Sequence, residues 1–133
     1  MTLDIVQDYA MECSMDPKAS RFIQDRLALN IDQEEQRRFY DKLLSDIRMS
    51  QLMIDLSGNY VVQRILENDD KVHEKVLEHL RGRIVFNSKH RHGCRVVQVA
   101  FKEFKNPLRD EMLEEMQEDF ITCSMDFNGN HVI

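Results

Sequence analysis

The sequence predicts an all-α protein, a right-handed α-solenoid, because one short block recurs four times and one helical stripe recurs between the blocks. Each block is a small residue followed by two variable residues, two apolar residues and, where the chain is long enough, Gln: Ala19–Gln24, Gly58–Gln63, Gly93–Gln98 and Gly129–Ile133. The residues after the small one, called here the first block residues, are 39, 35 and 36 positions apart. A period of this length is typical of stacked supersecondary units.

Helical geometry accounts for the order of residues within the block. At about 100° per residue, the first, second and fifth block residues share one arc, whereas the third and fourth turn away from it. The pairs that turn away are all apolar: Phe22-Ile23, Val61-Val62, Val96-Val97 and Val132-Ile133. We therefore expect these pairs in the core and the other three positions on one exposed face.

A second helix follows each of the first three blocks, because apolar residues recur there at i, i+4, i+5 and i+8. The stripes are Phe39-Leu43-Leu44-Ile47, Val72-Val76-Leu77-Leu80 and Leu108-Met112-Leu113-Met116. Short apolar segments, 51–54 and 83–86, lead into the second and third blocks, so we expect three helices in each unit. Asp16-Pro17 and Asn106-Pro107 supply an N-cap and a first-turn proline.

Glycine precedes the first block residue in three of the four blocks, at Gly58, Gly93 and Gly129, and Ala19 takes its place in the first. A missing side chain there fits either close packing of neighbouring units at a helix start or clearance for a ligand on the exposed face. The sequence leaves both explanations open. The first unit is longer than the others, and we expect the extra residues near Asn30-Ile31-Asp32.

The composition is typical of a folded intracellular chain, with 42% hydrophobic and 32% charged residues among 133. Three cysteines, Cys13, Cys94 and Cys123, lack the pairing of a metal site, and the N-terminus lacks the features of a secretory signal. No apolar stretch approaches the roughly 20 residues of a membrane span. We therefore expect a cytoplasmic protein with reduced thiols.

Charge is distributed unevenly along the chain. The net charge is −6, but the segment Arg81–Lys105 holds seven Lys and Arg against one Glu, a local charge of +6. Acidic residues gather in the segments between blocks, above all in the run 110–119. Such a run is more often a solvated helix face than an acidic docking surface.

These blocks resemble the PUF, or Pumilio-homology, RNA-binding repeats. The resemblance runs from about Asp16 to Ile133 and rests on four motifs in order: Ser-Arg-Phe-Ile-Gln, Gly-Asn-Tyr-Val-Val-Gln, His-Gly-Cys-Arg-Val-Val-Gln and Gly-Asn-His-Val-Ile. The order is similar to the first four repeats of a Pumilio-type domain. The resemblance implies a sequence-specific binder of single-stranded RNA that reads one base per repeat.

By this resemblance, the first and fifth block residues contact base edges and the second block residues stack between bases. The base-edge residues would be Ser20, Gln24, Asn59, Gln63, Cys94, Gln98 and Asn130, and the stacking residues would be Arg21, Tyr60, Arg95 and His131. Asn with Gln implies uracil, a small residue with Gln implies adenine, and the family's polarity places the N-terminal repeat at the RNA 3′ end. The expected core is 5′-UAUA-3′.

The resemblance also implies a role and a domain layout. The role would be post-transcriptional control through messenger RNA 3′ untranslated regions, by translational repression or decay. We expect a cap or half-repeat at 1–15, repeats at 16–50, 51–82 and 83–119, and the start of a fourth at 120–133. Because the chain stops inside a block, we expect it to be part of a larger protein, or to have its end covered by a second copy or a partner.

Other classes of function fit the residues less well. The segment Lys89–Cys94 contains two His and one Cys, but no second cluster completes a metal site and its arginines would repel a cation. Cys94 lacks the partners of a catalytic nucleophile. We expect no enzyme activity, no metal, no cofactor and no DNA or membrane partner, although protein partners could bind the outer face. The alternative is an armadillo- or HEAT-like protein-binding scaffold, which would have no need of the repeated polar pattern.

Overall fold

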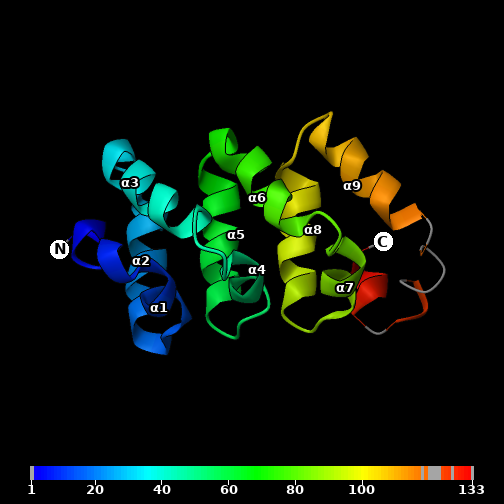
Figure 1. Cartoon of the computed structure of the whole chain (residues 1–133), viewed down its shortest axis with the longest axis horizontal. Coiled ribbons are helices and arrows are strands. Elements are labelled where there is room, and N and C mark those ends of the chain that lie inside the picture. Colours follow the sequence, from blue (N-terminus) through cyan, green and yellow to red (C-terminus); the bar gives the residue numbers. More distant parts are fainter. Residues whose placement is uncertain (1, 118, 120–123, 127, 133) are drawn as a thin grey trace.

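The computed structural model describes residues 2–117, 119, 124–126 and 128–132, and all regular structure within them is helical (Figure 1). The α-helices are α1 Ala10–Met15, α2 Pro17–Leu29, α3 Gln33–Leu44, α4 Met49–Leu52, α5 Gly58–Asn68, α6 His73–Leu80, α7 Ile84–Lys89, α8 Gly93–Glu103 and α9 Leu108–Gln117. Four 3₁₀ helices are η1 Leu3–Ile5, η2 Gln7–Tyr9, η3 Asp70–Val72 and η4 Gly129–His131.

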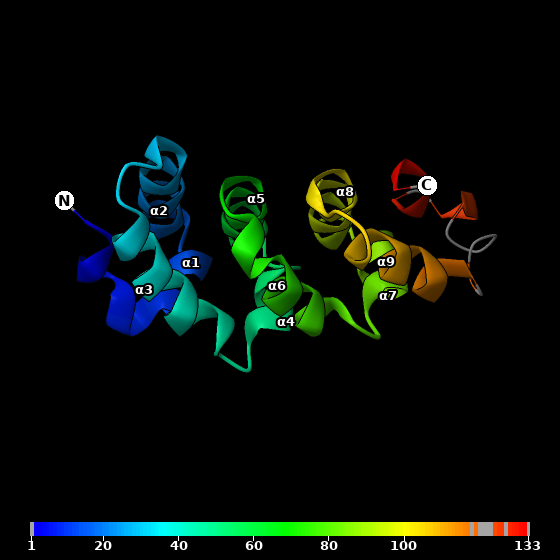
Figure 2. The same ribbon diagram turned by 90° about the horizontal axis from the view of Figure 1, so that it is seen from above.

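The helices form two layers along one axis (Figure 2). The block helices α2, α5 and α8 lie side by side in one layer, with α2 in contact with α5 and α5 with α8. The stripe helices α3, α6 and α9 lie in the other layer together with the short helices α1, α4 and α7. Three helices in the order short, block, stripe recur three times, which confirms the predicted α-solenoid.

The third and fourth block residues hold the layers together, as expected. Val61, Val62, Val96 and Val97 have no solvent exposure, and Ile23 is equally buried. Phe22 and Val132 are partly buried against the same core, and Ile133 lies outside the described residues. Burying a side chain of this size stabilises the fold by about 1.5–3 kcal/mol.

The stripe prediction is correct for most positions and wrong at two. Ile47 is 93% exposed, because α3 ends at Leu44 and the Asp46 carboxylate closes a turn by accepting from the N–H of Arg48 at 2.8 Å. Leu113 is 50% exposed, whereas Leu77 at the same stripe position is fully buried. Val72 belongs to η3 and is partly buried.

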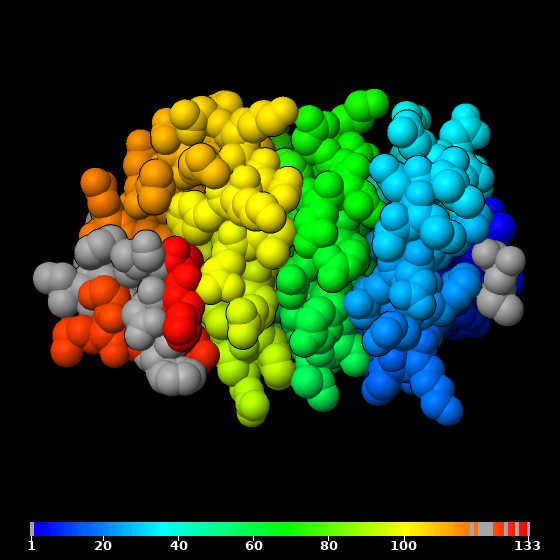
Figure 3. Space-filling view, turned by 180° about the vertical axis from the view of Figure 1, so that it is seen from behind, coloured from blue at the N-terminus to red at the C-terminus, as the bar shows by residue number. Residues whose placement is uncertain are grey.

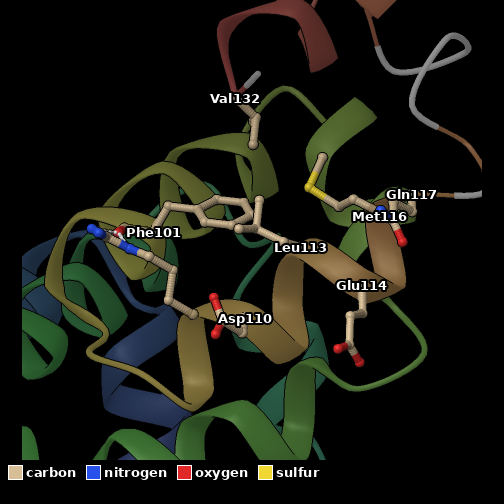
Figure 4. A pocket seen from close by; sticks show the side chains of 8 residues that line it. Phe101, Asp110, Leu113, Glu114, Met116, Gln117 and Val132 are labelled. Atoms are coloured by element: carbon tan, nitrogen blue, oxygen red, sulfur yellow. Dashed lines mark hydrogen bonds between the residues drawn. The ribbon is translucent and has the colours of Figure 1, made fainter.

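Leu113 lines a groove of about 790 Å³ at the C-terminal end of the described solenoid (Figure 4). Phe101 of α8, Met116 of α9 and Val132 form its apolar walls, and Asp110 and Glu114 lie along its edge. Leu77 on α6 is fully buried inside the array, whereas Leu113 on α9 lines this groove at its end. The stripe period could not reveal the difference, since it is the same in both helices.

The predicted helix start is confirmed for α2 and is off by one residue for α9. The Asp16 carboxylate accepts from the backbone N–H groups of Lys18 and Ala19, and Pro17 is the first residue of α2. In the third unit α9 begins at Leu108, one residue later than expected, after a cis bond between Asn106 and Pro107. The block helices α2, α5 and α8 each end nine residues after their first block residue. The segment Asn30–Asp32 follows α2 and connects it to α3.

Close packing explains the two block glycines Gly58 and Gly93. A Cβ on Gly58 would lie 2.8 Å from the carbonyl oxygen of Leu52, and one on Gly93 would lie 2.9 Å from that of Asn87. Leu52 belongs to α4 and Asn87 to α7, so each glycine packs on the short helix of its own unit. At Gly93 the added Cβ would also meet the preceding unit, because Ile54 would lie 3.1 Å away.

Part of the acidic run on α9 serves the fold. Glu115 accepts from the N–H groups of Gly82 at 2.7 Å and Ile84 at 2.9 Å, and Glu111 pairs with Arg81 at 2.6 Å. This ion pair lowers the pKa of Glu111. Asp110 and Glu114 are exposed, as a solvated face predicts. Across the described ranges, no helix is both long and apolar enough to span a membrane.

Candidate nucleic-acid interface

The polar block residues line one face of the solenoid, but they are exposed to very different degrees. Figure 3 shows this face, on which α2, α5 and α8 appear as adjacent blue, green and yellow bands. The second block residues, Arg21, Tyr60, Arg95 and His131, are exposed. The fifth block residues, Gln24, Gln63 and Gln98, are half-buried. Both positions therefore present groups to a ligand.

The first block residues are buried, which contradicts the expectation that they lie on the exposed face. Ser20, Asn59 and Cys94 are 2%, 1% and 4% exposed. The backbone of Asn130 belongs to η4, and its side chain lies outside the described part of the structure. Helical geometry gave the correct arc for these residues, but it could not show how deeply each side chain lies below the surface.

One contact explains the burial in all three units. Each first block side chain donates to the carbonyl oxygen three residues earlier: Ser20 Oγ to Pro17 at 3.3 Å, Asn59 Nδ2 to Leu56 at 3.0 Å and Cys94 Sγ to Arg91 at 3.5 Å. Asn59 Nδ2 also donates to the Asp55 carbonyl at 2.8 Å. Their polar hydrogens thus point back toward the N-terminal start of the helix and not outward.

In the second unit this contact fixes the fifth block residue as well. Since the Asn59 amide nitrogen is committed to the backbone, its oxygen faces Gln63, whose Nε2 donates to Asn59 Oδ1 at 2.9 Å. The Gln63 amide oxygen and its second N–H remain as one acceptor and one donor. In the third unit Gln98 Nε2 instead donates to the carbonyl of His131 at 2.8 Å.

A hollow of about 530 Å³ lies between the first two block helices. Its lining comprises Pro17, Ser20, Arg21, Gln24, Leu56, Ser57 and Tyr60. Four of these residues were predicted as site residues, and the hollow brings together the polar edge of one unit with the stacking groups of two. Leu56 was missed, although it is a large apolar side chain with 66% exposure in the turn before α5.

A hydrogen-bond acceptor recurs four residues before each first block residue, and only the one at Asp16 was predicted from the sequence. Four residues before each first block residue stands a side chain that accepts hydrogen bonds from the turn: Asp16, Asp55, His90 and Asp126. These side chains set the position of the first block residues, because they hold the turn to which Ser20, Asn59 and Cys94 donate.

The third unit holds several cations that pair with no carboxylate in the described part of the structure. Within the described ranges, Arg83, Lys89, Arg91 and Arg95 take part in no ion pair, whereas Arg21 lies 3.7 Å from Asp25. Unpaired cations close to stacking groups can contact a phosphate backbone.

Cys94 is buried at the start of α8 and follows two histidines, His90 and His92, in the chain. Burial raises the pKa of the Cys94 thiol, so it stays protonated near neutral pH. The described residues contain no group of three or more His, Cys, Asp or Glu side chains placed to hold a metal ion.

Comparison with known proteins gives the same family along the chain. The model of the Pumilio-family RNA binding repeat matches residues 9–44, 48–81 and 88–116. Pumilio homolog 1 of Xenopus laevis is 36% identical over 115 residues, which cover 84% of this chain and 9% of that protein. The mRNA-binding protein puf3 of Schizosaccharomyces pombe is 35% identical over 72 residues, 53% of this chain and 10% of that protein.

Solved structures agree with the fold over nearly the whole chain. PUF-8 in complex with PBE-RNA matches with a TM-score of 0.92 and 28% identity, covering 99% of this chain and 38% of that one. The Puf3 RNA binding domain bound to a Cox17 RNA 3′ UTR recognition sequence matches with a TM-score of 0.90, 28% identity and the same coverage. The chain thus spans less than two fifths of these domains and about a tenth of the curated relatives.

Proposed function

Because the chain belongs to the family of Pumilio RNA-binding repeats, we propose that it binds single-stranded RNA on the face of α2, α5 and α8, one base per unit. The hollow between α2 and α5 carries this proposal. Arg21 and Tyr60 offer planar groups on its two sides, and Gln24 offers an amide within it. A base that enters can stack on the planar groups while its edge meets the amide, and each stacked base contributes about 1–3 kcal/mol.

The proposed base order follows from the side chains of each unit. Ser20 with Gln24 and Cys94 with Gln98 leave room for a purine, so units one and three read adenine. Asn59 with Gln63 reads uracil, and Asn130 would read a second uracil. With the N-terminal unit at the RNA 3′ end, the core is 5′-UAUA-3′. Ser20, Asn59 and Cys94 act mainly by shaping the site, because each is almost fully buried. Asn59 in addition holds the Gln63 amide.

The proposed biological role rests on what the names of the relatives say. One relative is an mRNA-binding protein, and one structural neighbour is bound to a 3′ UTR recognition sequence. We extend this to post-transcriptional control of messenger RNA by a cytoplasmic, non-catalytic protein. The unit boundaries 16–50, 51–82 and 83–119, with a cap before them and a fourth unit from 120, remain part of the same proposal.

Fluorescence anisotropy with labelled UAUA-containing single-stranded RNA at fixed salt tests the function. We expect micromolar or weaker binding, about −8 kcal/mol or less favourable, because only three or four bases are read. UCUC and CCCC should compete poorly. Binding that ignores sequence would favour the protein scaffold.

Two variants separate stacking from charge. Arg95→Ala should weaken binding more than Lys102→Ala, since Arg95 is an exposed second block residue and Lys102 lies near the far end of the same helix. Equal losses would indicate an electrostatic site without base stacking.

A further inference from the structure

The four turn-holding side chains make the same pair of hydrogen bonds, although one of them is not a carboxylate. Asp16, Asp55 and Asp126 each use one carboxylate oxygen to accept from the backbone N–H groups two and three residues later, at 2.7–2.9 Å. His90 does so with Nδ1, from His92 at 3.0 Å and Gly93 at 3.2 Å. The position therefore requires an acceptor of two hydrogen bonds.

A histidine can fill this position in only one protonation state. The ring nitrogen Nδ1 accepts hydrogen bonds when the imidazole is neutral with its proton on Nε2, and both ring nitrogens become donors when it is charged. An aspartate remains an acceptor at every pH well above about 4. Of the four turns, the third is thus the one that loses its acceptor under mildly acidic conditions.

The turn held by His90 carries the polar block residues of the third unit. The carbonyl of Arg91, inside the turn, accepts from Cys94 Sγ, and the carbonyl of His90 accepts from the N–H of Cys94 at 2.9 Å. Arg95 follows directly on α8. Loss of the bonds to Nδ1 would therefore displace the first and second block residues of this unit and leave α2 and α5 in place.

We propose that His90 is a positioning residue whose protonation weakens base recognition by the third unit, so that this unit, unlike the first two, reads its base in a pH-dependent way. The inference rests on the proposed function, because it concerns the base that Cys94, Arg95 and Gln98 would contact. His90 itself touches no base in this scheme.

The surroundings of His90 favour its neutral form. Burial and the positive charges of His92 and Arg91 lower the pKa of His90. The ring of His92 lies 5.7 Å away, and that of Phe86 on α7 lies 6.2 Å away. From the adjoining units, Asn128 donates its neutral amide to the carbonyl of Lys89, while Asp55 and Asp126 are engaged with their own turns.

The sign of the pH effect is set by this direction. A histidine whose folded-state pKa lies below its ordinary value of about 6.5 stabilises the fold above that value. The stabilisation is lost as the pH falls through the lower, folded-state pKa.

Base competition at two pH values tests the inference. Anisotropy titrations of the intact chain at pH 7.5 and pH 5.5 would compare UAUA with UCUA, which changes the base of unit three, and with UAUC, which changes that of unit one. We expect the preference for UAUA over UCUA to fall at least threefold at pH 5.5 and the preference over UAUC to stay constant.

His90→Asp is the matched variant, because it installs the residue that the other units use. It should keep the preference over UCUA at both pH values. Its melting temperature without RNA should fall less than that of the wild type between pH 7.5 and 5.5. An unchanged preference in the wild type, or an equal loss in His90→Asp, would overturn the inference.

The same titrations separate this inference from the proposed function. Absence of any preference for UAUA at pH 7.5 in both proteins would contradict sequence-specific RNA binding. The melting curves would still show whether His90 holds its turn in a pH-dependent way, since they require no RNA.

Discussion

Asn59 shows how a buried residue can set the orientation of a half-buried neighbour, Gln63. Both of its amide hydrogens face the carbonyls of Asp55 and Leu56, so its oxygen must face Gln63. The Gln63 amide is thereby held with its nitrogen toward Asn59. A fixed amide presents its donor and acceptor in a fixed order, which distinguishes one base edge from another.

Asn59→Ser should change the base preferred by the second unit from uracil to adenine. The variant recreates the Ser-Gln pair of the first unit, frees the Gln63 amide and opens space for a purine. Competition between UAUA and UAAA measures the change, which we expect to exceed tenfold in the ratio of affinities. A preference that stays with UAUA would contradict the assignment of this base to Asn59 and Gln63, provided that circular dichroism shows an intact fold.

At the scale of the helices, the short helix restricts which residue can begin the block helix in the second and third units. Gly93 lies against the backbone of α7, and Gly58 lies against that of α4. The sequence has only Gly or Ala at this position, but it could not show which neighbouring atoms exclude a larger residue. The clashing backbone belongs to the short helix of the same unit, whereas the sequence left packing between neighbouring units and clearance for a ligand open.

Gly93→Ala should destabilise the protein by about 1–3 kcal/mol, the usual cost of forcing a methyl group into a packed site. The added Cβ would meet the Asn87 carbonyl oxygen at 2.9 Å, and backbone cannot move aside as a flexible side chain can. Urea unfolding should show a lower midpoint with an unchanged slope. Gly82→Asn is the control for an added side chain without a clash, because no atom lies within 4 Å of an added Cβ there and Asn tolerates the positive φ of 77° better than most residues. A stabilised Gly93→Ala would show that helix propensity outweighs packing here.

The stripe helix of the third unit is also tied to the segment before it. Glu115→Ala should cost about 1.5–3 kcal/mol, because it removes a charged acceptor shared by the N–H groups of Gly82 and Ile84. The neighbouring Glu114 is exposed and makes no such bond in the described structure, so Glu114→Ala should stay within about 0.5 kcal/mol of the wild type. Thermal unfolding of both variants decides the matter, and equal effects would contradict a role of Glu115 in joining α9 to the α6–α7 connection.

Across the whole molecule, periodic features were predictable and solitary ones were not. The three-helix units, the buried Val pairs and the exposed second block residues result from spacing that every unit repeats. The exposure of Ile47 depends on where α3 ends, and that of Leu113 depends on the position of α9 beside the terminal groove. The depth of Ser20, Asn59 and Cys94 depends on hydrogen bonds to a turn, which apolar periodicity does not encode.

The uneven charge of the solenoid leads to a prediction about salt. A protein with a net charge of −6 should be repelled by RNA over long distances, yet Arg91 and Arg95 of the third unit are exposed and take part in no ion pair within the described ranges. Arg91 is exposed in the turn before α8. It occupies the same position there as Leu56 in the turn before α5, and Leu56 lines the hollow between α2 and α5. If RNA binds on the block-helix face as proposed, we expect Arg91 to contact a phosphate beside the start of α8.

Arg91→Gln should then reduce the dependence of binding on salt. Each phosphate contact to a single strand contributes about −0.7 to the slope of log K against log salt. Loss of one contact should make the slope less negative by about 0.7 and leave the order of base preference unchanged. Lys75→Gln is the control, because Lys75 is exposed on α6 in the other layer and should not affect the slope. If both variants changed the slope equally, the RNA would be responding to the overall charge of the molecule and not to a cation on the block-helix face.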